Sequence, residues 1–294
     1  MSGCMRWKRG RGSGNVIDAR GAGGGRRSGL PGGGRVALPG GLGLVGVLVF
    51  VAFQLLGGGG AFSVPSAYED GTAAPESQPI PAGQDPERDL KDFSVYVFDN
   101  AQEMWRSISK PYEDATLVLY RDGVSTGCGS ASSAVGPFYC PADQRVYLDL
   151  SFYRDMEQQL GAKGDFAWAY VLAHEMGHHV QKTSGTSDEV ERLRRDDPAQ
   201  ANPLSVRLEL QADCYAGVWA HSIFKAGDLE PGDVEEAIGA SEAVGDDRLQ
   251  RRASGSINPD SFTHGSSAQC AKWFKTGQEA GEPAACDTFS ADEL

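Results

Sequence analysis

The sequence predicts an α+β domain, mainly helical with a small sheet, that is preceded by one transmembrane helix. Three observations lead to this prediction. Two apolar runs, at residues 166–181 and 206–220, have the length of buried helices. Two shorter segments, at 115–120 and 144–150, have the composition of strands. An uncharged window at residues 36–62 follows a basic leader and is long enough to cross a bilayer.

The leader, residues 1–41, has a charge opposite to that of the remaining chain. It carries eight Lys or Arg and one Asp, a net charge of +7, and it is rich in glycine. We therefore expect a disordered cytoplasmic tail. The formal net charge of the whole chain is −13, which leaves −20 for everything after the leader. Such an acidic surface argues against nucleic acid as a partner.

The next segment, residues 42–62, is predicted to be a transmembrane anchor in the cell membrane. Because the positive charges precede it, the positive-inside rule places the N-terminus in the cytoplasm and the later residues outside, in a single-pass arrangement. A cleaved signal peptide is the alternative, but a leader of this length is unusual for one. Residues 63–88, rich in Pro, Gly and Ser, are typical of a linker, and residues 89–294 are expected to form one folded domain.

The domain opens with an amphipathic pattern at 89–109, typical of a helix that packs one face on a core. The strand at 115–120 follows, and the strand at 144–150 comes after a loop of small residues. Cys128 and Cys140 bracket that loop. Their position fits a disulfide if the domain lies outside the cytoplasm.

The H-E-x-x-H pattern occupies residues 174–178, inside the first apolar run. On a helix, His174 and His178 lie one above the other on the same face, so both imidazoles can bind one metal ion. Glu175 lies beside that ion, where its carboxylate can take a proton from water. Three polar groups in an apolar helix need partners, and one divalent cation satisfies them together.

The second apolar run carries Glu209 and Asp213 at positions i and i+4, again on one helix face. Two carboxylates directed at a core need a partner. Glu209 is therefore the candidate for the third zinc ligand, and Asp213 is the candidate acceptor that orients a ligand imidazole. The spacing also permits these two residues to exchange roles. An exposed acidic stripe beside Arg207 is the alternative without a metal.

Several stretches together resemble one protein family. They are Met5-Arg-Trp, Asn15-Val-Ile-Asp18, the single anchor, and the segments 128–141, 174–181 and 208–214. In these the chain resembles the bacterial membrane-anchored putative neutral zinc metallopeptidases, and its HExxH helix followed by ExxxD resembles the gluzincin arrangement. The resemblance covers nearly the whole chain. It implies a zincin-like metallopeptidase domain that binds one Zn2+ and acts on a peptide or protein substrate.

The predicted function is a membrane-anchored, zinc-dependent metallopeptidase that hydrolyses peptide bonds outside the cytoplasm. Zinc held by His174, His178 and Glu209 would activate a water molecule. Glu175, as general base, would take its proton and carry it to the leaving amine. The alternative is a catalytically idle zinc-binding ectodomain that acts as a membrane-tethered binding or assembly module. The presence of Glu175 favours the enzyme, because a binding module needs no general base.

A further group must donate to the oxyanion that develops on the substrate. The candidate is His264, in a loop that opens a predicted helix at 268–275, and Tyr215 is a weaker candidate. A histidine that caps this helix or packs in the loop is the alternative. His179 points away from the ligand face and His221 lies about three turns beyond Glu209, so neither is expected to bind the metal.

The family resemblance also implies a disulfide between Cys214 and Cys286, which would join the C-terminal tail to the helix of the third ligand. Cys270 is then left over, and Cys4 lies in the predicted cytoplasmic tail, where it stays reduced. A cysteine-bound zinc is the alternative for these residues. The absence of a C-x-x-C pair disfavours it.

In zinc proteases of the thermolysin-like kind, an extended substrate pairs with the edge strand of the sheet beside the active-site helix. The strand at 144–150, which precedes that helix in the sequence, is the candidate for this edge. The alternative is an interior strand that has no role in substrate binding.

Overall fold

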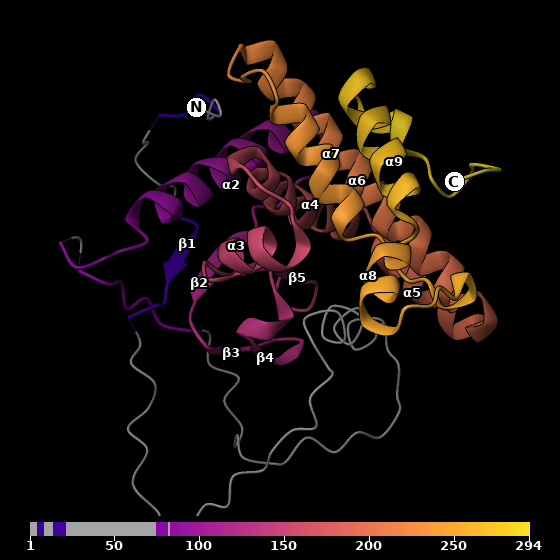
Figure 1. Ribbon diagram of the computed structural model, residues 1–294, viewed down its shortest axis with the longest axis horizontal. Coiled ribbons are helices and arrows are strands. Elements are labelled where there is room, and N and C mark those ends of the chain that lie inside the picture. Colours follow the sequence, from indigo (N-terminus) through magenta and orange to yellow (C-terminus); the bar gives the residue numbers. More distant parts are fainter. Residues whose placement is uncertain (1–4, 9–13, 22–74, 82) are drawn as a thin grey trace, which may run out of the picture.

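The computed structural model of the chain describes residues 5–8, 14–21, 75–81 and 83–294. In this part of the chain a small sheet is packed against a larger set of helices (Figure 1), which confirms the mainly helical α+β prediction. The predicted anchor at 42–62 lies outside the described residues. Among the described helices, none is long and apolar enough to cross a membrane.

The main sheet has four strands in the order β1-β2-β6-β5. Strand β2 (Thr116–Tyr120) pairs in parallel with β1 (Val16–Asp18) on one side and with β6 (Arg145–Asp149) on the other. Strand β5 (Phe138–Cys140) pairs antiparallel with β6 at the edge. A separate hairpin consists of β3 (Gly123–Thr126) and β4 (Gly129–Ser132).

The helices follow the same order as the sequence patterns. The α-helices are α2 (Arg88–Ile108), α3 (Phe152–Asp155), α4 (Asp165–Thr183), α5 (Thr186–Asp196), α6 (Ala201–Ala226), α7 (Asp233–Ala243), α8 (Asp246–Ser254) and α9 (Ser267–Ala280). Short helical turns are η1 (Ser133–Val135), η2 (Met156–Leu160), η3 (Pro198–Gln200), η4 (Pro259–Ser261) and η5 (Pro283–Cys286).

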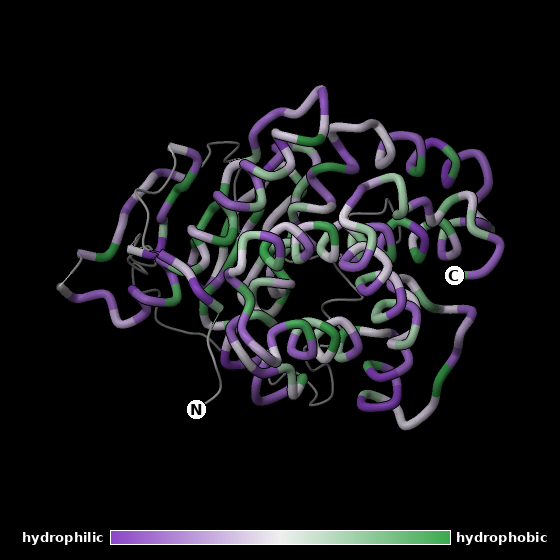
Figure 2. Tube along the Cα trace, turned by 90° about the horizontal axis from the view of Figure 1, so that it is seen from above, coloured by the Kyte–Doolittle hydropathy of each residue, from purple (hydrophilic) through white to green (hydrophobic). Residues whose placement is uncertain are grey.

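Both faces of the sheet are covered. Leu117 and Leu119 of β2 belong to the main core, to which helices α2 and α4 also contribute. Val118 and Tyr120 belong to a smaller core on the opposite face, where residues of the β3–β4 hairpin pack against them. Because these two pairs belong to different cores, successive residues of β2 are buried on alternate faces, which explains the continuous apolar sequence of this strand. In Figure 2 the hydrophilic segments lie mostly along outer turns and loops.

The expectation that the strand at 144–150 forms the edge of the sheet is wrong. Strand β6 lies between β2 and β5, so its backbone groups are already paired on both sides. The edge position belongs to β5, within the loop predicted between the two cysteines. A run of only three residues, 138–140, is too short for an alternating pattern to reveal it.

The expectation of disorder for residues 1–41 is wrong for the described part of that leader. Met5 is 1% exposed and lies in the main core. Strand β1 adds Val16 to Asp18 to the sheet beside β2 (Figure 1). The predicted linker is in contact with the leader, because Gly21 N–H donates to Gln78 O at 2.7 Å and Gln78 N–H donates to Asp18 O at 2.8 Å.

Arg20 joins the leader to the start of the domain by a buried ion cluster. Its side chain is fully buried, and its Nη2 lies 2.8 Å from Asp18 Oδ2 and 2.6 Å from Asp85 Oδ2. Glu87 Oε2 lies 3.4 Å from Nη1. Removal of a buried cation leaves its carboxylates without compensation, which costs far more than loss of an exposed pair.

Helices α6 and α9 form a second packing unit. A Cβ at Gly217 would lie 2.0 Å from Phe274 O, and a Cβ at Gly277 would lie 1.9 Å from Cys214 O. Glycine at both positions therefore lets the two backbones touch. The Cys214–Cys286 disulfide ties the C-terminal turn to α6, and the Cys128–Cys140 disulfide closes the loop before β6.

We expect Arg20→Ala to lower the free energy of unfolding by about 3–5 kcal/mol, because it leaves buried carboxylates uncompensated. Urea unfolding of the full chain measures this change. Arg192→Ala is the matched control, since its ion pairs with Glu189 and Asp196 are exposed, and we expect little change from it. Equal effects of the two substitutions would contradict a structural role for the leader.

Candidate metal centre

The site is formed where helix α4 packs on helix α6. Gly177, inside the H-E-x-x-H pattern, lies against the α6 backbone, and a Cβ there would lie 3.0 Å from Ala212 O. The small residue lets the two helices approach closely. This approach brings Glu209 of α6 opposite the two histidines of α4.

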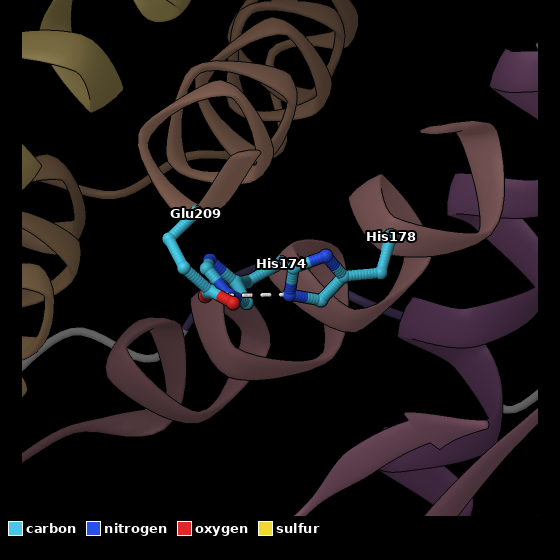
Figure 3. Close-up of side chains that lie close together, drawn as sticks. All are labelled: His174, His178 and Glu209. Atoms are coloured by element: carbon cyan, nitrogen blue, oxygen red, sulfur yellow. Dashed lines mark hydrogen bonds and ion pairs between the residues drawn. The ribbon is translucent and has the colours of Figure 1, made fainter. Parts of the chain in front are cut away.

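Two imidazoles and one carboxylate converge at this contact. His174 Nε2 lies 3.3 Å from Glu209 Oε2, and His178 Nε2 lies 3.4 Å from the same oxygen. Figure 3 shows Glu209 extending from its helix toward both rings. One donor atom from each residue lies within 4.8 Å of the others. Two histidine nitrogens and a carboxylate oxygen are a typical protein ligand set of a hydrolytic zinc site, so the residues present fit this metal.

The second nitrogen of each ring is held by another side chain. His174 Nδ1 lies 2.9 Å from Asp213 Oδ1, which also accepts a hydrogen bond of 2.5 Å from the hydroxyl of Tyr170. His178 Nδ1 lies 2.9 Å from Gln181 Oε1. With a proton on Nδ1 of each ring, both Nε2 atoms are available to a metal. Glu209 therefore faces the ligand nitrogens, whereas Asp213 orients a ring.

Tyr170 and Gln181 were not singled out by the sequence. Gln181 is fixed in turn, because its Nε2 donates to Leu208 O at 2.7 Å. It stands three residues after His178, a spacing that places both side chains on one helix face. This spacing is the sequence feature that could have identified Gln181 as a partner of His178. Tyr170 precedes His174 by one turn on the same face.

The charges of the site compensate one another. Burial alone would lower the pKa of His174, but hydrogen bonds to Asp213 and Glu209 raise it well above its usual value. Burial would likewise raise the pKa of Glu209, but His178 and His174 hold it well below its usual value. The carboxylates thus favour positive charge at this position, and a divalent cation can supply that charge in place of protons.

Glu175 lies beside the ligand set and is 9% exposed. Burial raises the pKa of its carboxyl group, and the two neighbouring histidines oppose that change. The backbone N–H of Tyr139 in β5 also favours the charged form of this carboxyl group, and both residues line the same pocket. The edge strand therefore contacts the group predicted to act as base.

A pocket of about 340 Å3 opens over these residues. Its wall includes His174, Glu175, His178 and Glu209. The remaining lining is largely apolar and comes from several elements, with Val135, Phe138, Phe152, Val190 and Leu249 among its residues. Strand β5 and the segment before it form one side of this pocket.

His264, from the loop before α9, also lines the pocket. Its Nδ1 lies 3.2 Å from Asp246 Oδ1, while Asp246 Oδ2 accepts the backbone N–H groups of Thr263 and His264 at 2.5 and 2.7 Å. Burial would lower the pKa of His264, but Asp246 and Glu209 raise it to about 9. Ser266 caps helix α9 instead of His264. No local pattern around Asp246 signalled its position beside His264.

The other candidates lie elsewhere. Tyr215, the weaker oxyanion donor, packs edge-on against Trp105 at 5.1 Å in the second core and does not line the pocket, so that expectation is wrong. His179 Nε2 lies 2.6 Å from Glu113 O, and His221 Nδ1 lies 2.7 Å from Gln278 O. Cys270 is a buried free cysteine within the described residues and borders the pocket.

Comparison with known proteins agrees with this geometry. The family described as "Putative neutral zinc metallopeptidase" matches residues 5–289. The Escherichia coli (strain K12) protein "Uncharacterized protein YpfJ" is 45% identical over 296 residues, which cover 97% of this chain and 99% of the relative. The Mycobacterium tuberculosis (strain H37Rv) protein "Uncharacterized protein Rv2575" is 43% identical over 224 residues, 72% of this chain and 75% of the relative.

No solved structure matches the chain at a significant level. The family match covers the leader, the H-E-x-x-H helix and the C-terminal helices alike. With this coverage, and with 45% identity to a relative matched along nearly its full length, the chain belongs to the family described as putative neutral zinc metallopeptidases.

Proposed function

We propose that this protein is a zinc-dependent metallopeptidase that hydrolyses peptide bonds. The position of Glu175 carries the proposal, because this buried carboxylate stands beside two converging Nε2 atoms and a carboxylate oxygen. His174, His178 and Glu209 would hold one zinc ion. A hydrolytic zinc site needs such ligands together with an adjacent base.

Zinc, when bound, supplies a Lewis acid that polarises a carbonyl group and acidifies water. The residues of the chain perform the proton transfers. Glu175 accepts a proton from the attacking water and then delivers it to the leaving amine. Its raised pKa suits both steps, since a base whose pKa lies nearer to neutral pH can also release the proton.

His264 is the proposed donor to the oxyanion. Asp246 Oδ1 lies 3.2 Å from its Nδ1 and raises the pKa of the imidazole, which favours the protonated form. A charged donor stabilises the negative oxygen that develops in the transition state more than a neutral donor does. Asp246 thereby acts as a positioning residue for His264.

The substrate is proposed to be an extended peptide that lies along β5. Within the described residues this strand pairs with β6 alone, so one edge of its backbone can bind another strand. The pocket beside β5 offers apolar contacts from Phe138, Val190 and Leu249. We therefore expect cleavage next to an apolar side chain.

The domain is proposed to work outside the cytoplasm, with the apolar window at 42–62 as its attachment to the membrane. Two disulfides support this location, because disulfides persist in oxidising compartments outside the cytoplasm. The leader adds a constraint, because Gly21 and Gln78, which flank the window, are joined by a hydrogen bond of 2.7 Å. A single crossing would separate these residues by roughly 30 Å of hydrocarbon. We therefore propose that both flanks of the window lie on the same side of the membrane.

Glu175→Gln is expected to keep its zinc and to lose peptide cleavage by on the order of 100- to 10,000-fold, because the amide cannot accept the proton. Metal content by mass spectrometry and cleavage of a peptide library measure the two properties on the same sample. Glu191→Gln is the matched control, since Glu191 lines the pocket from α5 outside the ligand set. If wild type and Glu175→Gln both hold zinc and neither cleaves any peptide, the tethered binding module is the better interpretation.

Activity is expected to fall at alkaline pH, where His264 loses its proton, because Asp246 holds the pKa of this imidazole above its usual value. Asp246→Asn removes the charge that raises this pKa, so the alkaline limb of the kcat profile should move to lower pH. Asp247→Asn is the control, because Asp247 contacts Ser267 instead of His264. An alkaline limb at the same pH in wild type and Asp246→Asn would contradict the role of His264.

The topology is tested with an epitope tag at each end of the full chain, in spheroplasts treated with an external protease. If both flanks of the window lie on the outer side, both tags are expected to be digested. A cytoplasmic marker protein that stays intact controls for lysis. Digestion of the C-terminal tag alone would show a single crossing and contradict the proposal.

A further inference from the structure

A second group of carboxylates lies at the other end of the α4 helix. One oxygen from each of Asp165, Asp233 and Glu236 lies within 4.8 Å of the others. Asp165 is the first residue of α4 and Asp233 is the first residue of α7. At 1.5 Å per residue, Asp165 lies roughly 13 Å along the helix from His174. The group is therefore separate from the candidate zinc centre.

Two oxygens in this group lack partners. Asp233 is 0% exposed, and its Oδ2 accepts the backbone N–H of Glu230 at 2.8 Å. Its Oδ1 is buried and has no hydrogen-bond partner in the described part of the chain, and the same holds for Asp165 Oδ2. A buried carboxylate oxygen without a partner destabilises the folded state unless a proton or a cation satisfies it.

The N-termini of α4 and α7 carry partial positive charge, which explains only part of why three carboxylates gather there. Glu236 Oε2 accepts the N–H of Phe166 at 3.2 Å and so caps α4. Carboxylates at helix N-termini are commonly stabilised in this way. Capping does not account for the two unpartnered oxygens. Among the described residues, Asp165 and Asp233 form no ion pair with Lys, Arg or His.

The pKa values of Asp165 and Asp233 are both shifted in the direction that opposes negative charge. Burial and the neighbouring Asp233 raise the pKa of Asp165 to about 6. Burial raises the pKa of Asp233 as well. Both carboxyl groups would therefore gain from a nearby cation.

The backbone leaves room for the carboxylates to meet. Gly164 has a φ of +103°, and a Cβ at this position would lie 1.9 Å from Glu236 Oε2. Any other residue at 164 would push Glu236 away from the start of α4. The preceding glycine is thus required by the approach of the third carboxylate.

We propose that Asp165, Asp233 and Glu236 bind a calcium ion that joins the start of α4 to the start of α7. Carboxylate oxygens without nitrogen or sulfur donors are the ligands of hard cations, and calcium accepts irregular sets of six to eight oxygens completed by water and backbone carbonyls. The ion would fix the N-terminal end of the helix that carries His174 and His178. This role is structural and does not depend on peptidase activity.

The test is thermal unfolding of the full chain, freed of divalent cations, reloaded with zinc alone, and titrated with calcium at constant ionic strength. The wild type is expected to show a saturable rise in Tm, of about 5–10 °C at a hundredfold excess over the Kd. Asp233→Asn is expected to abolish this rise and to be more stable than wild type without calcium, because it removes a buried charge. Asp196→Asn, an exposed acid on α5, is the control and should keep the rise.

Isothermal titration calorimetry, with calcium added to the same zinc-loaded protein, measures binding directly. It provides a second test if the Asp233→Asn variant does not fold. Wild type should show one saturable site that Asp165→Asn, as a second variant, lacks. The proposal is wrong if calcium leaves the Tm of the wild type unchanged, or if Asp233→Asn responds as the wild type does. Neither readout requires peptide cleavage, so failure here is distinct from failure of the proposed peptidase function.

Discussion

The close contact between α4 and α6 is the constraint on which the site depends. Gly177 allows the two backbones to approach, and Glu209 then meets both imidazole Nε2 atoms. Each of these groups would lose hydration in a core, and each offsets the charge of the others. Because Asp213 and Gln181 hold the remaining ring nitrogens, the donors are oriented before any metal arrives.

The second half of the site comes from the C-terminal part of the chain. Helix α9 packs closely on α6 at Gly217 and Gly277, and this packing places the loop before α9 beside the pocket. There Asp246 accepts the N–H groups of this loop and also holds His264. The site thus contains two histidine–carboxylate pairs that border the same pocket, His174 with Asp213 and His264 with Asp246.

The leader shows that both ends of the sequence contribute to one folded unit. Strand β1 and the buried Arg20 cluster connect residues before the apolar window to residues after it. A fragment that began at Asp89 would lack this strand and one edge of β2 would lose its partner. The hydrogen bonds of this part of the chain therefore hold residues from the two sides of the apolar window close together.

The sequence by itself determined the features that depend on local periodicity. Helix spacing placed His174 and His178 on one face and paired Glu209 with Asp213, because i and i+4 are adjacent on any helix. Which of those two carboxylates meets Nε2 was decided only by the tertiary structure, since it depends on how α6 is rotated against α4. The edge strand β5, the strand β1 and the contact of Asp246 with His264 also required the fold. Strand β1 pairs with residues that are far away in the sequence, and the Asp246–His264 contact joins two segments that share no periodic pattern. Strand β5 pairs with the nearby β6, but at three residues it is too short to show an alternating pattern.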